Sequence, residues 1–138
     1  MAISLKKHTP GAGEQESARL NDVNSNWGTI EQAINDLQAN ASLLAIDVTP
    51  KPGFAVAGKL YKVGRIYIMP LTINGSIPAA WTPVATIPST YAPTSGIYVP
   101  AATGGATFGM GSISNNGTIN AYAPGGTGQI NFILAWAK

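Results

Sequence analysis

The side chains that most often carry catalysis are confined to one end of this sequence. All six acidic residues lie within the first 47 positions, the single histidine is His8, and there is no cysteine. After Asp47 the chain contains no Asp, Glu, His or Cys. General acid–base pairs, nucleophilic triads, carboxylate or imidazole metal cages and thiol catalysis all require these groups. We therefore expect no catalytic residue, no metal site, no cofactor and no enzymatic activity.

Charge is distributed just as unevenly. Residues 1–47 carry six acids and three cations, residues 48–138 carry five cations and no acid, and residues 66–137 carry no charge. Nucleic-acid-binding proteins spread Lys and Arg along a face to neutralise many phosphates. Four cations between Lys51 and Arg65 and one at Lys138 do not make such a face, so we expect no nucleic-acid partner.

The N-terminal lysines do not begin a targeting signal. Lys6 and Lys7 are not followed by the apolar segment of a secretory signal. No run of about 18 apolar residues is present, so the sequence predicts no membrane insertion. We expect a protein that is made in a cytoplasm and stays there or leaves by a route other than secretion.

The chemistry that remains is recognition. Aromatic faces next to amides and hydroxyls suit the C–H faces and hydroxyls of sugars, and they suit protein epitopes as well. Aromatic residues inside strand-like segments are expected to lie in the core or at a subunit contact; these are Tyr67, Phe108, Phe132 and Trp136.

Aromatic and polar residues near the ends of these segments are the candidates for a ligand site. The Arg65 side chain could pair with a phosphate or with a carboxylate of a partner. It could equally be a surface residue without a binding role. The predicted saccharide-binding residues are Trp81, Tyr91, Tyr98, Asn120, Tyr122 and Arg65.

Ahead of these segments, eight apolar residues alternate at spacings of three and four. Such a narrow heptad seam favours packing of helix on helix, so the sequence predicts a coiled-coil helix over 17–46 and an oligomer of two or three chains. Gly28 leaves a break near 24–28 open. A helix this short is marginal alone, and the following domain must share the contact. The seam residues are Leu20, Val23, Trp27, Ile30, Ile34, Leu37, Ala41 and Leu44.

Turn-forming residues divide the rest of the chain. They predict an N-terminal arm at 1–16, a linker at 47–53 and a head domain at 54–138 that is an antiparallel β-sandwich or barrel. Asn116 and Gly117 predict a hairpin with a type I′ turn, and Pro70 predicts a strand edge or bulge. The last predicted strand, 129–137, has too few polar residues for one of its faces to be exposed to solvent. We therefore expect it to be buried in the head or to lie against a neighbouring subunit. The predicted strands are 59–63, 65–73, 84–87, 97–100, 107–113, 118–122 and 129–137.

Segments along the chain together resemble a known family. They are Leu-Asn-Asp-Val-Asn to Ile-Glu-Gln-Ala-Ile-Asn-Asp-Leu (20–37), Lys-Val-Gly-Arg-Ile-Tyr-Ile (62–68), Ala-Thr-Ile-Pro-Ser-Thr-Tyr-Ala-Pro (85–93) and Ser-Asn-Asn-Gly-Thr-Ile-Asn (114–120). Their order resembles the small trimeric receptor-binding or tail-fibre head proteins of tailed phages that infect Gram-positive bacteria. This chain has Ala92 where that family usually has Arg, and it lacks the shoulder and neck between helix and head.

The resemblance implies a homotrimer of β-sandwich or barrel heads on the phage tail tip or baseplate, made in the host cytoplasm. It implies that the heads bind a host cell-wall or surface saccharide without cleaving it, and that the arm at 1–16 attaches to other tail or baseplate proteins. It places no individual binding residue. A structural baseplate or tail-fibre connector that binds only other virion proteins remains the alternative.

Overall fold

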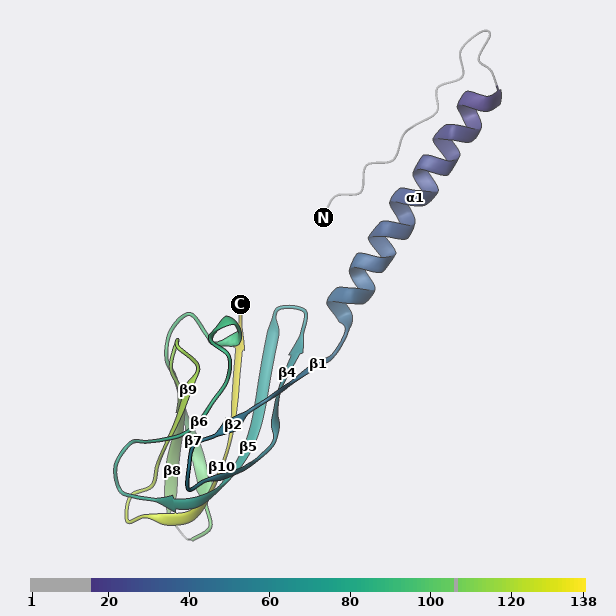
Figure 1. Ribbon diagram of the computed structural model, residues 1–138. Coiled ribbons are helices and arrows are strands. Elements are labelled where there is room, and N and C mark those ends of the chain that lie inside the picture. The colour runs from purple at the N-terminus through teal and green to yellow at the C-terminus, as the bar shows by residue number, and fades with distance from the viewer. Residues whose placement is uncertain (1–15, 106) are drawn as a thin grey trace. The chain divides into compact units, whose positions relative to one another are not determined.

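The computed structural model describes residues 16–105 and 107–138, without the side chains of residues 16–20 and 22. The predicted arm, apart from its last residue, lies outside the described residues, and so does the side chain of seam residue Leu20. The chain divides into two compact units, Met1–Ser42 and Leu43–Lys138. The described part of the first unit is helix α1, and the second is the β head (Figure 1).

Helix α1 spans Glu16–Ala41 without the break that Gly28 left open. Among the described seam residues of the helix, Val23, Trp27, Ile34 and Leu37 are exposed, and Trp27 is 65% exposed. The helix ends before residue 46, which corrects the predicted boundary. Leu44 begins strand β1 instead of continuing the seam, because Leu44–Asp47 pairs with β4 and Ile46 packs against the head core.

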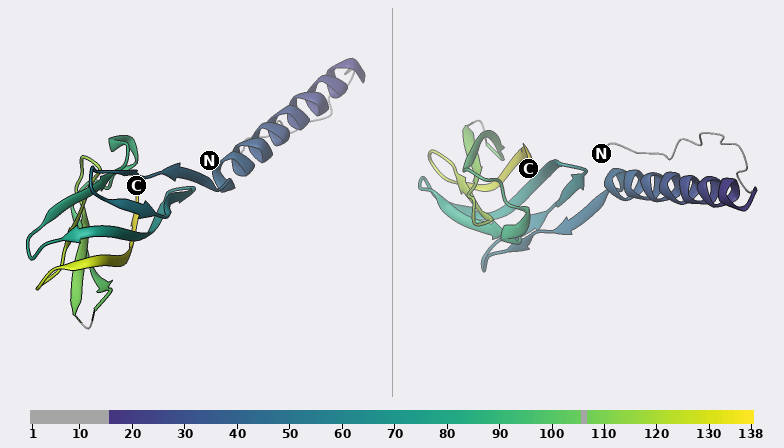
Figure 2. Two further views of the ribbon diagram at one scale, coloured as in Figure 1. Left: turned by 60° about the horizontal axis from the view of Figure 1, so that its bottom comes forward. Right: turned by 90° about the horizontal axis from the view of Figure 1, so that it is seen from above.

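The head is one antiparallel sheet of ten strands. Its strand order is β1-β4-β5-β10-β7-β8-β9-β6-β2, with β3 paired to β5. The first and last strands of this order are separated only by Val48 in the chain, so the sheet is nearly closed into a barrel (Figure 2). The strands are β1 (Leu44–Asp47), β2 (Thr49–Pro50), β3 (Ala55–Ala57), β4 (Lys59–Val63), β5 (Ile66–Ile77), β6 (Thr82–Thr86), β7 (Ile97–Thr103), β8 (Phe108–Ile113), β9 (Thr118–Tyr122) and β10 (Thr127–Ala137), with a 3-10 turn η1 at Ser89–Tyr91.

The segment predicted as a linker, 47–53, is part of the head. Thr49–Pro50 forms β2 against β6, and the amide of Lys51 donates to the carbonyl of Val84 at 2.9 Å. The prolines in this segment fit because β2 is an edge strand, where a missing amide hydrogen breaks no ladder on the open side. The head therefore begins at Leu43 rather than at residue 54.

The predicted hairpin joins β8 to β9, but its turn type differs from the prediction. A type I′ turn needs positive φ at both central residues, and among the described residues only glycines have positive φ. Gly117 has φ +87°, and its amide donates to the carbonyl of Ser114 at 3.0 Å. This pattern fits a longer loop with a left-handed glycine, and Asn116 supports it by accepting from the amide of Thr118 at 2.9 Å.

Pro70 lies in a strand that is paired on both sides, opposite Ile133 on β10. It is tolerated because its carbonyl points toward Gly58, between β3 and β4, where the outer ladder is interrupted. Its missing amide hydrogen therefore faces this interruption and not the ladder with β10. The expectation of an irregularity at Pro70 holds on the β3–β4 side.

The core follows the two-residue alternation of β5 and β10. Met69 pairs with Leu134 and Leu71 with Phe132, and these side chains are buried. Tyr67 stacks on Trp136 with ring centroids 5.5 Å apart. Three of the aromatics predicted in the core or at a contact, Tyr67, Phe132 and Trp136, lie in the core. The fourth, Phe108, is 81% exposed and is not part of the core of this chain.

We predict that Gly111→Ala destabilises the head by about 1–3 kcal/mol, because overpacking strains a filled core. A Cβ atom at Gly111 would lie 2.5 Å from the ring of Phe132. The matched control is Gly128→Ala, since a Cβ there meets nothing within 4 Å. Urea unfolding followed by tryptophan fluorescence measures both, and equal midpoints for the two variants would contradict this packing.

Candidate functional site

Three aromatic side chains form a row across the outer side of the head; Trp81 and Tyr98 are exposed and Tyr122 is half-buried. Tyr98 on β7 and Tyr122 on β9 lie on either side of strand β8. The Trp81 ring contacts both, with centroids 5.6 Å from Tyr98 at an interplanar angle of 74° and 5.7 Å from Tyr122 at 33°. Because Trp81 reaches both tyrosines, it lies over β8. We call Trp81, Tyr98 and Tyr122 the aromatic row.

The strand register places two polar residues on the same side of the sheet. Tyr98 is opposite Ser112, and Ser112 is opposite Asn120. On β8, Ser112 alternates with the inward-facing Gly111 and Ile113, so its side chain points outward with the row. Ser112 is nevertheless only 5% exposed, as expected for a small side chain beneath larger ones.

The polar groups of this region are available to a ligand. In the described part of the chain, the side chains of Trp81, Tyr98, Tyr122, Asn120 and Ser112 form no hydrogen bond with the protein. No fully buried side-chain nitrogen or oxygen there lacks a partner. The Ser112 hydroxyl, which has no partner, must therefore still reach solvent at the floor of the row.

Four of the six predicted site residues are thus brought together: Trp81, Tyr98, Asn120 and Tyr122. The fifth and sixth, Arg65 and Tyr91, contact the C-terminal end of β10 at Lys138 and Trp136. Nε of Arg65 donates to the backbone oxygen of Lys138 at 3.0 Å, and the carbonyl of Tyr91 accepts from the indole of Trp136 at 3.1 Å. These contacts hold the end of β10 in place. Saccharide binding by Arg65 and Tyr91 stays a prediction.

Sequence reasoning missed Ser112, which is the buried polar residue beneath the row. Serine is frequent in the turns of this chain and gives no signal of its own. Its place between Tyr98 and Asn120 becomes visible only when the pairing of β7, β8 and β9 is known.

Charge is sparse on the head surface. Nζ of Lys59 lies 2.9 Å from the carboxylate of Asp47. The hydrogen bond to Asp47 and then its negative charge raise the pKa of Lys59, but such an exposed pair contributes little to stability. Among the described residues, no three acidic, histidine or cysteine side chains are grouped to hold a metal ion. In the part of the chain that the structure describes, no helix is both long and apolar enough to cross a bilayer.

A second outer surface has a different chemistry. Toward the Ile66 end of β5 and the Ala137 end of β10, the residues that alternate with the core are aliphatic and exposed, and Ile133 is 62% exposed. The register sets Ile68 opposite Ala135 and Pro70 opposite Ile133, which joins them into one patch. We call it the aliphatic face; it comprises Val63, Ile66, Ile68, Pro70, Ile133, Ala135 and Ala137.

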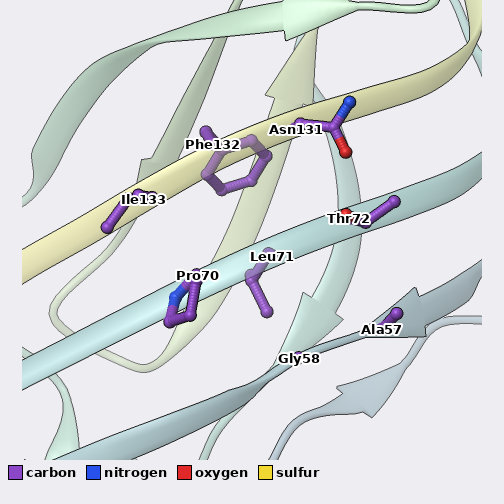
Figure 3. Close-up of a pocket in the computed structure, with 8 residues that line it drawn as sticks. All are labelled: Ala57, Gly58, Pro70, Leu71, Thr72, Asn131, Phe132 and Ile133. Atoms are coloured by element: carbon purple, nitrogen blue, oxygen red, sulfur yellow. The ribbon is translucent and has the colours of Figure 1, made fainter.

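The aliphatic face contains a hollow of about 580 Å³. Figure 3 shows Pro70 and Thr72 on β5 and Asn131 and Ile133 on β10 lining it, beside the interruption at Gly58. No charged side chain lines the hollow. Its few polar groups make it suited to an apolar partner surface more than to a hydroxyl-rich ligand.

The fold is that of phage receptor-binding domains. The chain is similar to the head domain of lactococcal phage bIL170, with a TM-score of 0.56 and 16% identity over 70% of this chain and 98% of that one. It is also similar to the receptor-binding protein gp15 of Listeria phage PSA, with a TM-score of 0.61 and 17% identity over 92% of this chain and 83% of that one. No protein-family model and no curated protein matches the sequence.

These likenesses bear out, at the level of fold, the family resemblance seen in the sequence. The match to the bIL170 head domain covers 70% of this chain, which is about the length of the head unit Leu43–Lys138. The second covers 92% of the chain, which is more than Leu43–Lys138 can supply. It therefore takes in helix α1 as well as the head.

Two tryptophans should respond differently to removal. Trp136 is buried, stacks on Tyr67 and donates to Tyr91, so Trp136→Ala should cost about 3–5 kcal/mol of unfolding free energy. Trp81 is 44% exposed, so Trp81→Ala should cost about 1 kcal/mol. Trp136→Phe keeps one aromatic ring but loses the N–H and part of the buried indole, so its cost should fall between them. Chemical unfolding measures all three, and an equal loss in the two alanine variants would contradict the distinction between core and surface.

Proposed function

We propose that this chain is a phage tail receptor-binding protein that attaches the virion to a host cell-surface saccharide without cleaving it. The observation that carries the proposal is the aromatic row with its unpartnered hydroxyl and amide groups, on a head with the fold of phage receptor-binding domains. Exposed aromatic rings with adjacent polar groups recognise hydroxyl-rich surfaces at low entropic cost. In the virion, the arm at 1–16 binds other tail or baseplate proteins.

The absence of catalysis in this proposal is supported by composition. Residues 48–138 contain no acidic residue, histidine or cysteine, so neither the row nor the hollow has a general acid, a general base or a thiol of its own. Hydrolysis of a glycosidic bond ordinarily uses a pair of carboxylates. The role proposed for this surface is therefore adhesion.

The assembly that we propose is a homotrimer. Two apolar surfaces that are exposed in the described part of the chain support self-association: the seam on α1, where Trp27 is exposed, and the aliphatic face of the head, where Ile68 and Ile133 are exposed. The surface around these residues carries few charges. Exposed apolar area of this extent therefore favours burial against a partner. The heptad pattern allows two or three chains, and the family resemblance favours three.

The alternative, a connector that binds only virion proteins, is favoured by the aliphatic face, because that face suits another protein as well as a second copy. The two functions differ in what the aromatic row contacts. In the connector the row would be covered by a partner protein, and in the receptor-binding protein it stays free for the host surface.

We predict that the full chain has a solution mass that is a multiple of 14.2 kDa, three times that value if the proposal is right. Ile133→Asp should shift the mass toward that of one chain, because a carboxylate cannot be buried unpaired at an apolar contact. The matched control is Ala79→Asp, at an exposed apolar residue outside both the aliphatic face and the seam. Light scattering after size exclusion measures the mass, and a monomeric parent chain would contradict the assembly.

We predict that fluorescently labelled full chain decorates the cells of the bacterial strains that the parent phage infects. Saccharide released from the walls of those cells should compete with this binding. Microscopy and flow cytometry provide the measurement, and strains that the phage does not infect provide the control. Absence of decoration, together with binding to isolated tail proteins, would support the connector instead.

A further inference from the structure

We infer that the aromatic row takes an uncharged sugar residue within a single head, and that phosphate or carboxylate groups of a wall polymer are not recognised there. This inference rests on the proposed function and specifies the ligand of the same site. It follows from the charges around the row, from the chemistry of its free polar groups and from the elements that supply them.

The strands that carry the row have no charge to offer an anion. Strands β5 to β10 contain no charged side chain. Among the cations of the head, Lys59 is paired with Asp47, and Lys62 lies 5.9 Å from the ring centroid of Tyr67. Burying a neutral polar group without a hydrogen bond costs about 2–7 kcal/mol. Burying a phosphate or carboxylate without a cation costs more, because the group is charged. The row is therefore selective against anionic groups.

The remaining cations define the alternative that must be tested. Nε of Arg65 donates to the backbone oxygen of Lys138, and Nζ of Lys138 donates to the carbonyls of Thr90 and Ala92. Lys51 lies nearest in register, because its amide bonds to Val84, whose neighbour Pro83 is opposite Asn120. If an anion were recognised at this side of the head, Lys51 is the cation that would pair with it.

The free polar groups of the row match a polyol. The hydroxyls of Tyr98, Tyr122 and Ser112 both donate and accept, the amide of Asn120 does both, and the indole of Trp81 donates. Each is without a partner in the described chain. Sugar hydroxyls also donate and accept, so they satisfy this set, whereas an anion only accepts and leaves the acceptors unmatched.

The aromatic rings supply the apolar half of the recognition. The planes of Trp81 and Tyr98 are close to perpendicular, and Tyr98 is 65% exposed. This arrangement leaves a ring face free for the C–H face of a pyranose beside the edge of a second ring. All five residues come from β7, β8, β9 and the segment before β6 of one chain, so the site needs no second subunit.

The test uses the full chain and a panel of neutral oligosaccharides of hexoses and N-acetylhexosamines, beside the same sugars carrying phosphate or carboxylate. Affinities are measured by calorimetry at about 50 and about 500 mM NaCl, because salt screens ionic contacts. We expect binding to a neutral member that changes less than about twofold with salt. Trp81→Ala and Tyr98→Ala should each weaken it by about tenfold or more, equivalent to 1.4 kcal/mol, and Tyr98→Phe by less.

The control variants are Lys51→Gln and Phe108→Ala, which should bind within about twofold of the parent, since neither belongs to the row. Unfolding midpoints confirm that each variant is folded. Binding confined to the charged sugars, a steep loss with salt, or a loss in Lys51→Gln overturns the inference, as does absence of binding to every neutral member. Cell decoration that persists unchanged in Trp81→Ala overturns this inference alone, whereas absence of decoration by the parent chain overturns the proposed function.

Discussion

The antiparallel pairing of β5 with β10 is the constraint on which the rest of the head depends. It runs from Ile66 opposite Ala137 to Ile77 opposite Thr127. Because side chains alternate along a strand, one register sends Met69 and Leu134 into the core and Ile133 to the surface. A slip of one residue would exchange the two sets. The same ladder therefore builds the core and the aliphatic face together, and the chain between β5 and β10 is left to form the opposite half of the sheet, which carries the aromatic row.

The two outer surfaces of the head differ in chemistry, and this difference is the basis of the functional account. The aliphatic face has exposed isoleucines and few hydrogen-bonding groups, so a partner gains by excluding water from it. The aromatic row has exposed rings beside hydroxyls and an amide that lack partners in the described chain. A hydroxyl-rich ligand can satisfy those groups, and an aliphatic partner would leave them unpaired. This contrast is why we propose self-association for the first surface and host recognition for the second.

Much of the fold was predictable because its signals are local. Strands β4 and β9 have the predicted bounds, since alternation and flanking turn residues mark them clearly. Strands β1 to β3 were not predicted, because segments of two to four residues near prolines carry no periodicity and form only through their partners. The helix end was misplaced for a similar reason: Leu44 fits the heptad spacing, but pairing with Lys62 decides its structure. In the site, residue type identified the aromatic rings, but only the register could separate Arg65 from them and add Ser112.

The central claim is that one outer surface of the head associates with other copies while the other stays free for the host. A crystal structure of the full chain in its solution assembly tests it most directly. The account predicts Ile68 and Ile133 buried between copies, with Trp81 and Tyr98 facing solvent. Burial of the aromatic row between copies, with the aliphatic face left in solvent, would contradict it.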